Sequence, residues 1–146
     1  MIAYIDSSVL VRAYLVDEPD HEEIVGLLAN PEVVAVTGTW TRIEVSGALV
    51  RAARAGRGDE KGLLALLDAD LGIDGPVTMV SANQADIETE ALVMVRAHGL
   101  RAMDAWHLAV AGLALPDLLE PGETASFATR DAAQADVAKA KAYQPL

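Results

Sequence analysis

The amino-acid sequence predicts an α/β protein built on a parallel sheet of four to five strands, with helices on both faces in three layers. Short apolar runs alternate with longer segments of helical character along the chain, as in successive strand–helix–strand units. The run Val33–Thr37 is apolar without alternation, which is typical of a strand buried on both faces. No repeat, low-complexity tract or linker interrupts the pattern, so we expect one domain over residues 1–146.

Turn and cap residues divide the first half of the chain into elements. Ser7 or Ser8 can cap a first helix, and Asp20 can start a second one. The pair Asn30–Pro31 marks a turn, and Gly56 ends a long helix. The expected elements are strands at 2–6 and 33–37 and helices at 7–16, 20–29, 41–55 and 59–71.

The second half follows the same order. Gly72–Pro76 breaks the chain before the third strand, and Ser81 or Asn83 can cap the helix after it. Gly99 suits the residue just past the end of that helix, and Pro116 stops the next one. The expected elements are strands at 77–80 and 125–129, an edge strand at 143–146, and helices at 83–98, 104–115 and 132–140.

Composition restricts the chemistry and the compartment. The chain has no cysteine, which excludes disulfides, thiolate catalysis and cysteine-based zinc sites and fits a reducing cytoplasm. The N-terminus is strand-like and has no basic leader, so we expect no signal peptide. The apolar helix at 105–115 is too short to cross a bilayer, which takes about 20 residues. We therefore expect a cytoplasmic protein without membrane contact.

The net charge of −11 does not favour nucleic-acid binding over the whole surface. It can instead attract a basic partner protein, or reflect a carboxylate-rich metal site on a solubilising surface. Basic residues nevertheless gather at 51–61. Arg51 and Arg54, three apart on the expected helix at 41–55, are candidates for holding an RNA backbone; the alternative is a solvated helix face.

Four acidic residues stand where a parallel sheet can bring them together. Asp6 ends the first strand, Asp131 lies two residues past the fourth, and Glu44 and Asp104 lie in or at the start of helices. Ligands in such folds bind beyond the carboxyl ends of the strands. Gathered carboxylates repel one another unless a cation joins them, and oxygen-only ligands favour Mg²⁺ or Mn²⁺.

Each acid also has an ordinary structural interpretation. Asp6 and Asp131 can act as a turn or helix cap, and Asp104 gains from the dipole of its helix. Thr41 and Glu44 have the spacing of a capping box. These interpretations leave unexplained why Asp6 closes a buried strand, where a carboxylate is costly without a partner.

The chain resembles the PIN-domain ribonucleases, specifically the VapC-type toxins of bacterial toxin–antitoxin pairs. The resemblance covers nearly the whole chain, and its motifs occur in the family's order. They are Tyr4-Ile-Asp-Ser-Ser-Val-Leu-Val11, Thr41-Arg-Ile-Glu-Val-Ser-Gly-Ala-Leu49 continuing to Arg54, Gly99-Leu-Arg-Ala-Met-Asp104 with Ala105-Trp-His-Leu-Ala109, and Phe127-Ala-Thr-Arg-Asp131.

The resemblance implies a PIN fold and an Mg²⁺-dependent (or Mn²⁺-dependent) endoribonuclease. Its catalytic residues would be Asp6, Glu44, Asp104 and Asp131, with Asp6, Asp104 and Asp131 as metal ligands. Ser7 and Thr129 would be neighbouring hydroxyls that orient a ligand or water. The run Ala132–Ala135 departs from the family pattern, which leaves Asp136 as a distant substitute for Asp131.

The resemblance also implies two protein partners, a VapB-type antitoxin and a second copy of the toxin. We expect an apolar stretch of the antitoxin to dock between walls formed by Val9–Leu15 and Ile24–Leu28. An arginine of the partner would then enter the carboxylate cluster. We expect the dimer axis near the helix after Glu44 or the helix at 83–98.

Two other functions remain as alternatives. The first is a catalytically idle PIN-like module that only binds proteins, which the four intact acids argue against. The second is a phospho-acceptor receiver or aspartate phosphatase; Ser7 and Ser8 replace the acid that such a phosphatase carries after its first strand. We expect His107 to serve in packing or beside the site rather than as a ligand, and Trp40 and Trp106 to lie in the core or a dimer contact.

Overall fold

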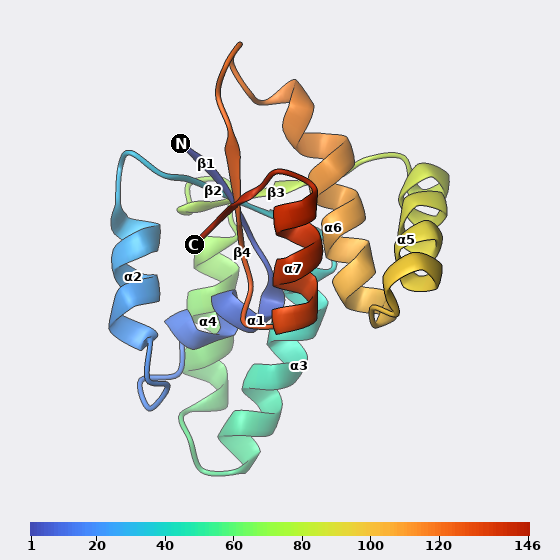
Figure 1. Cartoon of the computed structure of the whole chain (residues 1–146). Helices are drawn as coiled ribbons and strands as arrows, with labels where there is room; N and C mark the ends of the chain where they lie inside the picture. The colour runs from blue at the N-terminus through green and yellow to red at the C-terminus, as the bar shows by residue number, and fades with distance from the viewer.

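The computed structural model describes residues 1–146 and contains the expected parallel sheet. All five strands run in the same direction, in the order β3-β2-β1-β4-β5. Figure 1 shows helices on both sides of this sheet. This arrangement confirms the predicted fold class, including the short edge strand at the C-terminal end. The strands are β1 (Ile2–Ile5), β2 (Val34–Gly38), β3 (Val77–Val80), β4 (Ala125–Ala128) and β5 (Gln144–Pro145).

The helices also follow the predicted order, with two differences at their starts and ends. The segment after β1 is a single α-helical turn that tightens into a 3₁₀ turn over Val11–Ala13, rather than one helix to residue 16. Helix α6 begins two residues before Asp104, so this acid lies in its first turn instead of opening it. The helices are α1 (Ser7–Leu10), α2 (His21–Ala29), α3 (Thr41–Arg54), α4 (Glu60–Asp70), α5 (Gln84–His98), α6 (Ala102–Ala114) and α7 (Ala132–Ala140).

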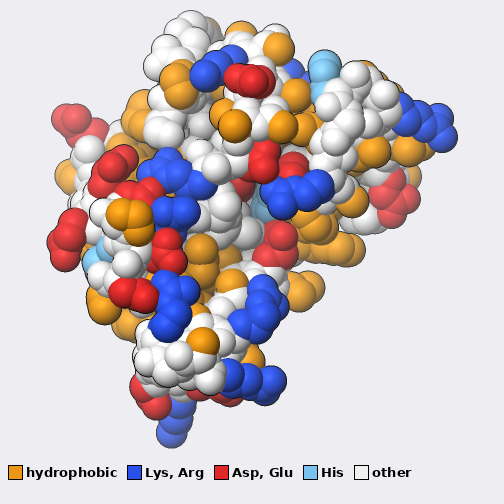
Figure 2. All heavy atoms as spheres, turned by 60° about the horizontal axis from the view of Figure 1, so that its bottom comes forward, with side chains coloured by type: hydrophobic (Ala, Val, Ile, Leu, Met, Phe, Trp, Pro, Cys, Tyr) orange, Lys and Arg blue, Asp and Glu red, His pale blue; other side chains and the backbone are white.

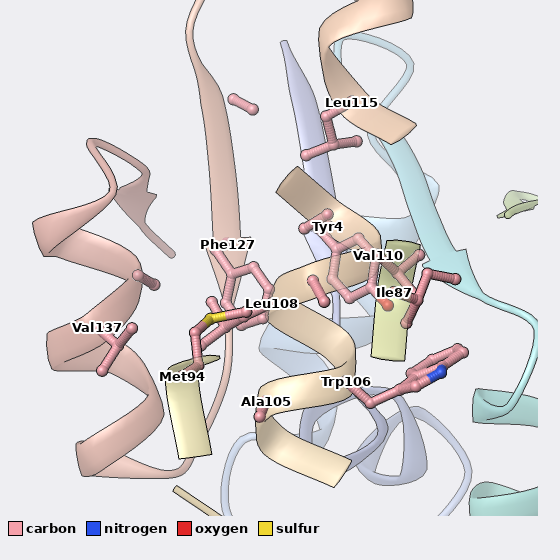
Figure 3. Packing of buried hydrophobic residues seen from close by; sticks show 14 of the residues in the cluster. Tyr4, Ile87, Met94, Ala105, Trp106, Leu108, Val110, Leu115, Phe127 and Val137 are labelled. Atoms are coloured by element: carbon pink, nitrogen blue, oxygen red, sulfur yellow. The ribbon is translucent and has the colours of Figure 1, made fainter. Parts of the chain in front are cut away.

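The side chains of β1 alternate between two hydrophobic cores, which makes the molecule three-layered. Ile2 and Tyr4 face a core shared with α5, α6 and α7 (Figure 3). Ala3 and Ile5 face the opposite core, shared with α1 to α4. All four of these strand residues are buried, as expected of the central strand of a parallel sheet.

Successive strands are added on one side of β1 as far as β3, and the next strand, β4, is added on its other side. β1 and β4 pair in register from Ile2 with Ala125 to Ile5 with Ala128. The backbone N–H of Asp6 donates to the Ala128 carbonyl at 3.1 Å, so the two carboxyl ends lie side by side. Ligands of open α/β sheets bind at such a switch point. None of the helices combines the length and apolarity that crossing a bilayer requires.

Candidate functional site

Asp6 is a buried carboxylate at the end of β1, with only 3% of its surface exposed. It is the N-cap of α1, where its Oδ1 accepts the Val9 N–H at 3.1 Å and the Ser8 hydroxyl at 2.7 Å. Burial raises the pKa of Asp6 above its ordinary value, against the opposing effect of the Ser8 and Thr129 hydroxyls. A carboxylate in this setting gains from any cation that approaches it.

Asp104 and Asp131 are joined by the guanidinium of Arg101. Arg101 Nε donates to Asp104 at 2.7 Å, and its Nη2 donates to Asp131 at 2.9 Å. Hydrogen bonding to Asp104 and the charges of Asp104, Asp131 and Asp6 raise the pKa of Arg101. The side chain of Arg101 is 74% exposed, whereas that of Asp104 is 14% exposed, so the cation covers the acids from outside. Figure 2 shows this end of the molecule, where acidic side chains gather among Lys and Arg side chains.

The two carboxylate oxygens of Asp131 make different contacts. Its Oδ1 accepts the Gln134 N–H at 2.9 Å and caps α7, which confirms the capping interpretation. Its Oδ2 accepts from Arg101 instead. Thr129 supports this arrangement, because its hydroxyl accepts the Asp131 N–H at 3.0 Å. The cap therefore uses Oδ1 and leaves Oδ2 to pair with Arg101.

Glu44 does not form the capping box that its spacing from Thr41 allows. The N-cap of α3 is Trp40, without a side-chain cap, and the Thr41 hydroxyl pairs with that of Thr37 at 2.7 Å. Glu44 Oε2 accepts instead from the Ser7 hydroxyl at 2.6 Å and from His107 Nε2 at 2.7 Å. Burial acts to raise the pKa of Glu44, but these hydrogen bonds and the nearby imidazole lower it below its ordinary value.

His107 is more closely involved in the site than the sequence indicates. It is 2% exposed, and both ring nitrogens have partners. Nε2 contacts Glu44 at 2.7 Å and the Ser7 hydroxyl at 3.2 Å, and Nδ1 contacts the Tyr4 hydroxyl at 2.9 Å. Spacing on α6 places His107 on the flank of Asp104, but the contacts to Tyr4 and Glu44 come from other elements. Arg101 was also missed; its signal was the i,i+3 spacing to Asp104.

Three of the four predicted acids thus belong to two hydrogen-bonded groups, and the fourth, Asp6, is buried beside α1. Arg101 joins Asp104 and Asp131, Ser7 and His107 hold Glu44, and Asp6 lies at the end of β1. As the side chains stand, no group of three or more His, Asp or Glu residues is close enough to hold a metal ion.

A hollow of about 430 Å³ lies beside Glu44, between α1 and α3. Its lining includes Ser7, Glu44, Gly47 and Arg51. Arg54, the other predicted RNA contact, does not line it; it reaches Glu60 at 4.0 Å. The structure therefore brings Arg51 to the site and points Arg54 toward α4.

An arginine-rich clamp fixes the loops around Asp6. Asp20 accepts from Arg12 and from Arg130, and these bonds lower the pKa of Asp20 to about 2. The backbone N–H of Arg130 also donates to the Ser8 hydroxyl at 2.9 Å. Because Ser8 in turn donates to Asp6, the clamp holds the loop before α7 against the start of α1. This sets the position of Asp131.

An apolar groove of about 290 Å³ lies between α2 and α4, and none of the four candidate acids lines it. Its lining includes Ala13, Tyr14, Val25 and Leu28, which come from both of the predicted groove walls. The Tyr14 hydroxyl donates to Asp70 at 3.0 Å at the polar end of the groove.

Comparison with known proteins gives a family and a shared fold. A search of curated proteins gave no match. The VapC20 toxin of Mycobacterium tuberculosis, which cleaves the sarcin–ricin loop, is similar with a TM-score of 0.61 and 17% identity, over 92% of this chain and 94% of that chain. VapBC2 of Rickettsia felis, bound to a DNA fragment from its promoter, has a TM-score of 0.62 and 13% identity over 100% and 98%. VapBC-1 of nontypeable Haemophilus influenzae has a TM-score of 0.60 and 14% identity, over 100% of this chain and 97% of that chain.

At these identities the solved structures establish the fold, and the sequence match establishes the family. The sequence profile of the PIN domain matches residues 3–140, nearly the full length of the chain and including all four predicted acids. The protein therefore belongs to the PIN-domain family.

Proposed function

We propose that this protein is a metal-dependent endoribonuclease that acts as the toxin of a type II toxin–antitoxin pair. The observation that carries the proposal is that the Arg101 guanidinium bridges Asp104 and Asp131, near the buried Asp6 and at the switch point of a PIN fold. Toxin and toxin–antitoxin structures share that fold, which supports this choice among nucleases.

The residues at this position suit a hard divalent cation. The guanidinium of Arg101 stands where positive charge is required, between carboxylates that would otherwise repel one another. Mg²⁺ keeps several waters, so the proposed ligands Asp6, Asp104 and Asp131 suffice without a closed protein cage. Bound Mg²⁺ or Mn²⁺ would supply charge for the phosphate oxygens and lower the pKa of the attacking water.

Glu44 is the proposed proton acceptor for phosphodiester hydrolysis. Its lowered pKa keeps the carboxylate ionised at neutral pH. As the water oxygen bonds to phosphorus, Glu44 would accept one proton of that water. The opposite phosphorus–oxygen bond would break, and the departing ribose oxygen would take a proton from a solvent water and leave as a hydroxyl. Ser7 would hold Glu44, and Thr129 would hold Asp131, during the reaction.

The proposed activity is tested by incubating the purified chain with RNA and Mg²⁺ or Mn²⁺, with and without EDTA. We expect endonucleolytic fragments with metal and none with chelator, because the bound ion would lower the pKa of the attacking water and supply charge for the phosphate oxygens. Mapping the cleavage ends after expression in cells would identify the RNA. If no RNA is cut with either metal while the chain still binds a partner protein, the idle binding module becomes the better interpretation.

The proposed partners are a VapB-type antitoxin and a second copy of the chain. The apolar groove along α2 is a suitable dock for an apolar antitoxin segment, and the charge of −11 would attract a basic one. We expect co-purification with the protein encoded immediately upstream, and growth arrest when this chain is expressed alone. Absence of both results would contradict the toxin role but not the proposed nuclease activity.

Light scattering during size-exclusion chromatography tests the homodimer. A strict monomer at micromolar concentration would contradict it.

Arg51 is the proposed contact for the RNA backbone, and Arg54 offers its matched control. We expect Arg51→Ala to weaken binding across RNA sequences and to reduce the salt slope by about 0.7 per lost phosphate contact. Arg54→Ala should have the smaller effect, because Arg54 lies outside the hollow beside Glu44. Binding is measured at several salt concentrations. An unchanged slope in the double variant would remove both residues from the RNA surface.

A further inference from the structure

A chain of hydrogen bonds runs from the backbone of β2 to Glu44. The Gly38 N–H contacts the Tyr4 hydroxyl at 3.0 Å, and that hydroxyl contacts His107 Nδ1 at 2.9 Å. His107 Nε2 contacts Glu44 Oε2 at 2.7 Å. Tyr4, Gly38 and His107 are all buried, so water does not compete for these bonds.

The direction of each bond follows from what its atoms can donate. The Gly38 N–H can only donate, so the Tyr4 oxygen accepts there and its single proton points to His107 Nδ1. With Nδ1 accepting, the ring of His107 carries its proton on Nε2 and donates it to Glu44.

The two donors to Glu44 leave its oxygens unequal. Ser7 and His107 both donate to Oε2, at 2.6 Å and 2.7 Å, whereas Oε1 accepts no hydrogen bond within the chain. We propose that Tyr4 and His107 are positioning residues that select one tautomer of the imidazole and turn Glu44 Oε1 toward the reacting water. This inference rests on the proposed nuclease function, in which Glu44 accepts the water proton.

Packing holds the same geometry. The Tyr4 ring stacks on Phe127 with ring centres 5.1 Å apart and planes 4° apart (Figure 3), and the ring of Trp106 meets His107 edge-on at 5.2 Å. A Cβ at Gly38 would lie 2.8 Å from the Tyr4 hydroxyl and 2.6 Å from the Trp106 ring. Only glycine therefore fits at this position without moving the Tyr4 hydroxyl.

The decisive variant is Tyr4→Phe, which removes the hydroxyl and keeps the stacked ring. Tyr143→Phe is its matched control: Tyr143 also packs on Phe127, at 5.8 Å, and its hydroxyl makes no hydrogen bond within the chain. We expect Tyr4→Phe to lower kcat roughly ten- to a hundredfold with KM for RNA unchanged, because a misaimed catalytic group costs rate rather than binding. The control should match wild type.

Nitrogen-15 NMR of the imidazoles tests the inference without activity. The chain has three histidines, so loss of one set of signals in His107→Gln assigns this ring. We expect an Nε2–H tautomer in wild type, and an Nδ1 resonance that moves in Tyr4→Phe and not in Tyr143→Phe. An Nδ1–H tautomer in wild type would overturn the inference.

Two substitutions of the ring separate positioning from imidazole chemistry. His107→Gln keeps an N–H donor near Glu44, and His107→Leu removes it. We expect the Gln variant to retain clearly more kcat than the Leu variant; equal losses, or Tyr4→Phe cleaving RNA at the control rate, would overturn the positioning role. Wild-type protein that cuts no RNA would refute the proposed function instead, while NMR would still report the tautomer.

Discussion

Replacing Asp6 or Asp104 with asparagine is expected to lower RNA cleavage by roughly a hundred- to a thousandfold or more, because each change removes a charge from the proposed metal site. Asparagine keeps the shape of the side chain and one oxygen acceptor. The loss should appear as a fall in kcat with Mg²⁺ or Mn²⁺ present. Asp86→Asn, an exposed acid in the first turn of α5, is the matched control and should cleave like wild type.

The same variants should remain folded, and the reason differs between the two acids. Asp6 has a raised pKa from burial, so its ionised form is less favourable in the folded chain than in the unfolded chain. Such a group stabilises the fold below its unfolded pKa, and that contribution is lost as the pH rises through the folded value. At neutral pH Asp6→Asn removes a buried charge while its oxygen can still cap α1, so thermal stability should stay equal or rise.

For Asp104 the change removes an ion pair with a largely exposed arginine, and such pairs contribute little to stability. Thermal unfolding of metal-free protein checks both expectations. Wild-type cleavage rates in both variants would show that the metal site is assigned to the wrong residues. Unfolding of Asp6→Asn would show that the cap at α1 needs the charge.

The order of elements was predictable because it depends on local patterns. Unbroken apolar runs marked the central strands, and Asn83 and Gly99 marked the ends of α5, where they form the N-cap and a left-handed C-cap. The first helix was predicted too long. Its tightening into a 3₁₀ turn at Val11–Ala13 lies beside the clamp in which Arg12 meets Asp20, and that contact links segments eight residues apart.

The candidate acids were predictable from their places at strand ends and helix starts, but their partners were not. Glu44 fits a capping box by spacing, and only the fold shows that it reaches Ser7 and His107, 37 and 63 residues away in the sequence. The pairing of Arg101 with Asp131 spans 30 residues in the same way. Local pattern identifies which side chains carry charge, whereas packing decides which of them meet.

Arg101 occupies the position that a metal ion is proposed to take, so the two should compete. Its Nε and Nη2 engage Asp104 and Asp131 at 2.7 Å and 2.9 Å, using the oxygens that a metal would need. The side chain is 74% exposed and can swing outward without disturbing the core. An ion that binds here must therefore first displace the guanidinium.

Arg101→Gln is expected to make metal-free protein less stable and metal binding tighter. Without the guanidinium the two carboxylates repel each other, which lowers the melting temperature of the metal-free form. Because exposed ion pairs are weak, the Kd for Mn²⁺ should fall by only roughly three- to tenfold. Calorimetric titration with Mn²⁺ measures the Kd, and thermal unfolding with and without the ion measures the stability. Arg42→Gln is the matched control, since it removes an exposed pair with Asp68. Equal Kd values in wild type and Arg101→Gln would contradict competition, and weaker binding in the variant would show that Arg101 assists the metal instead.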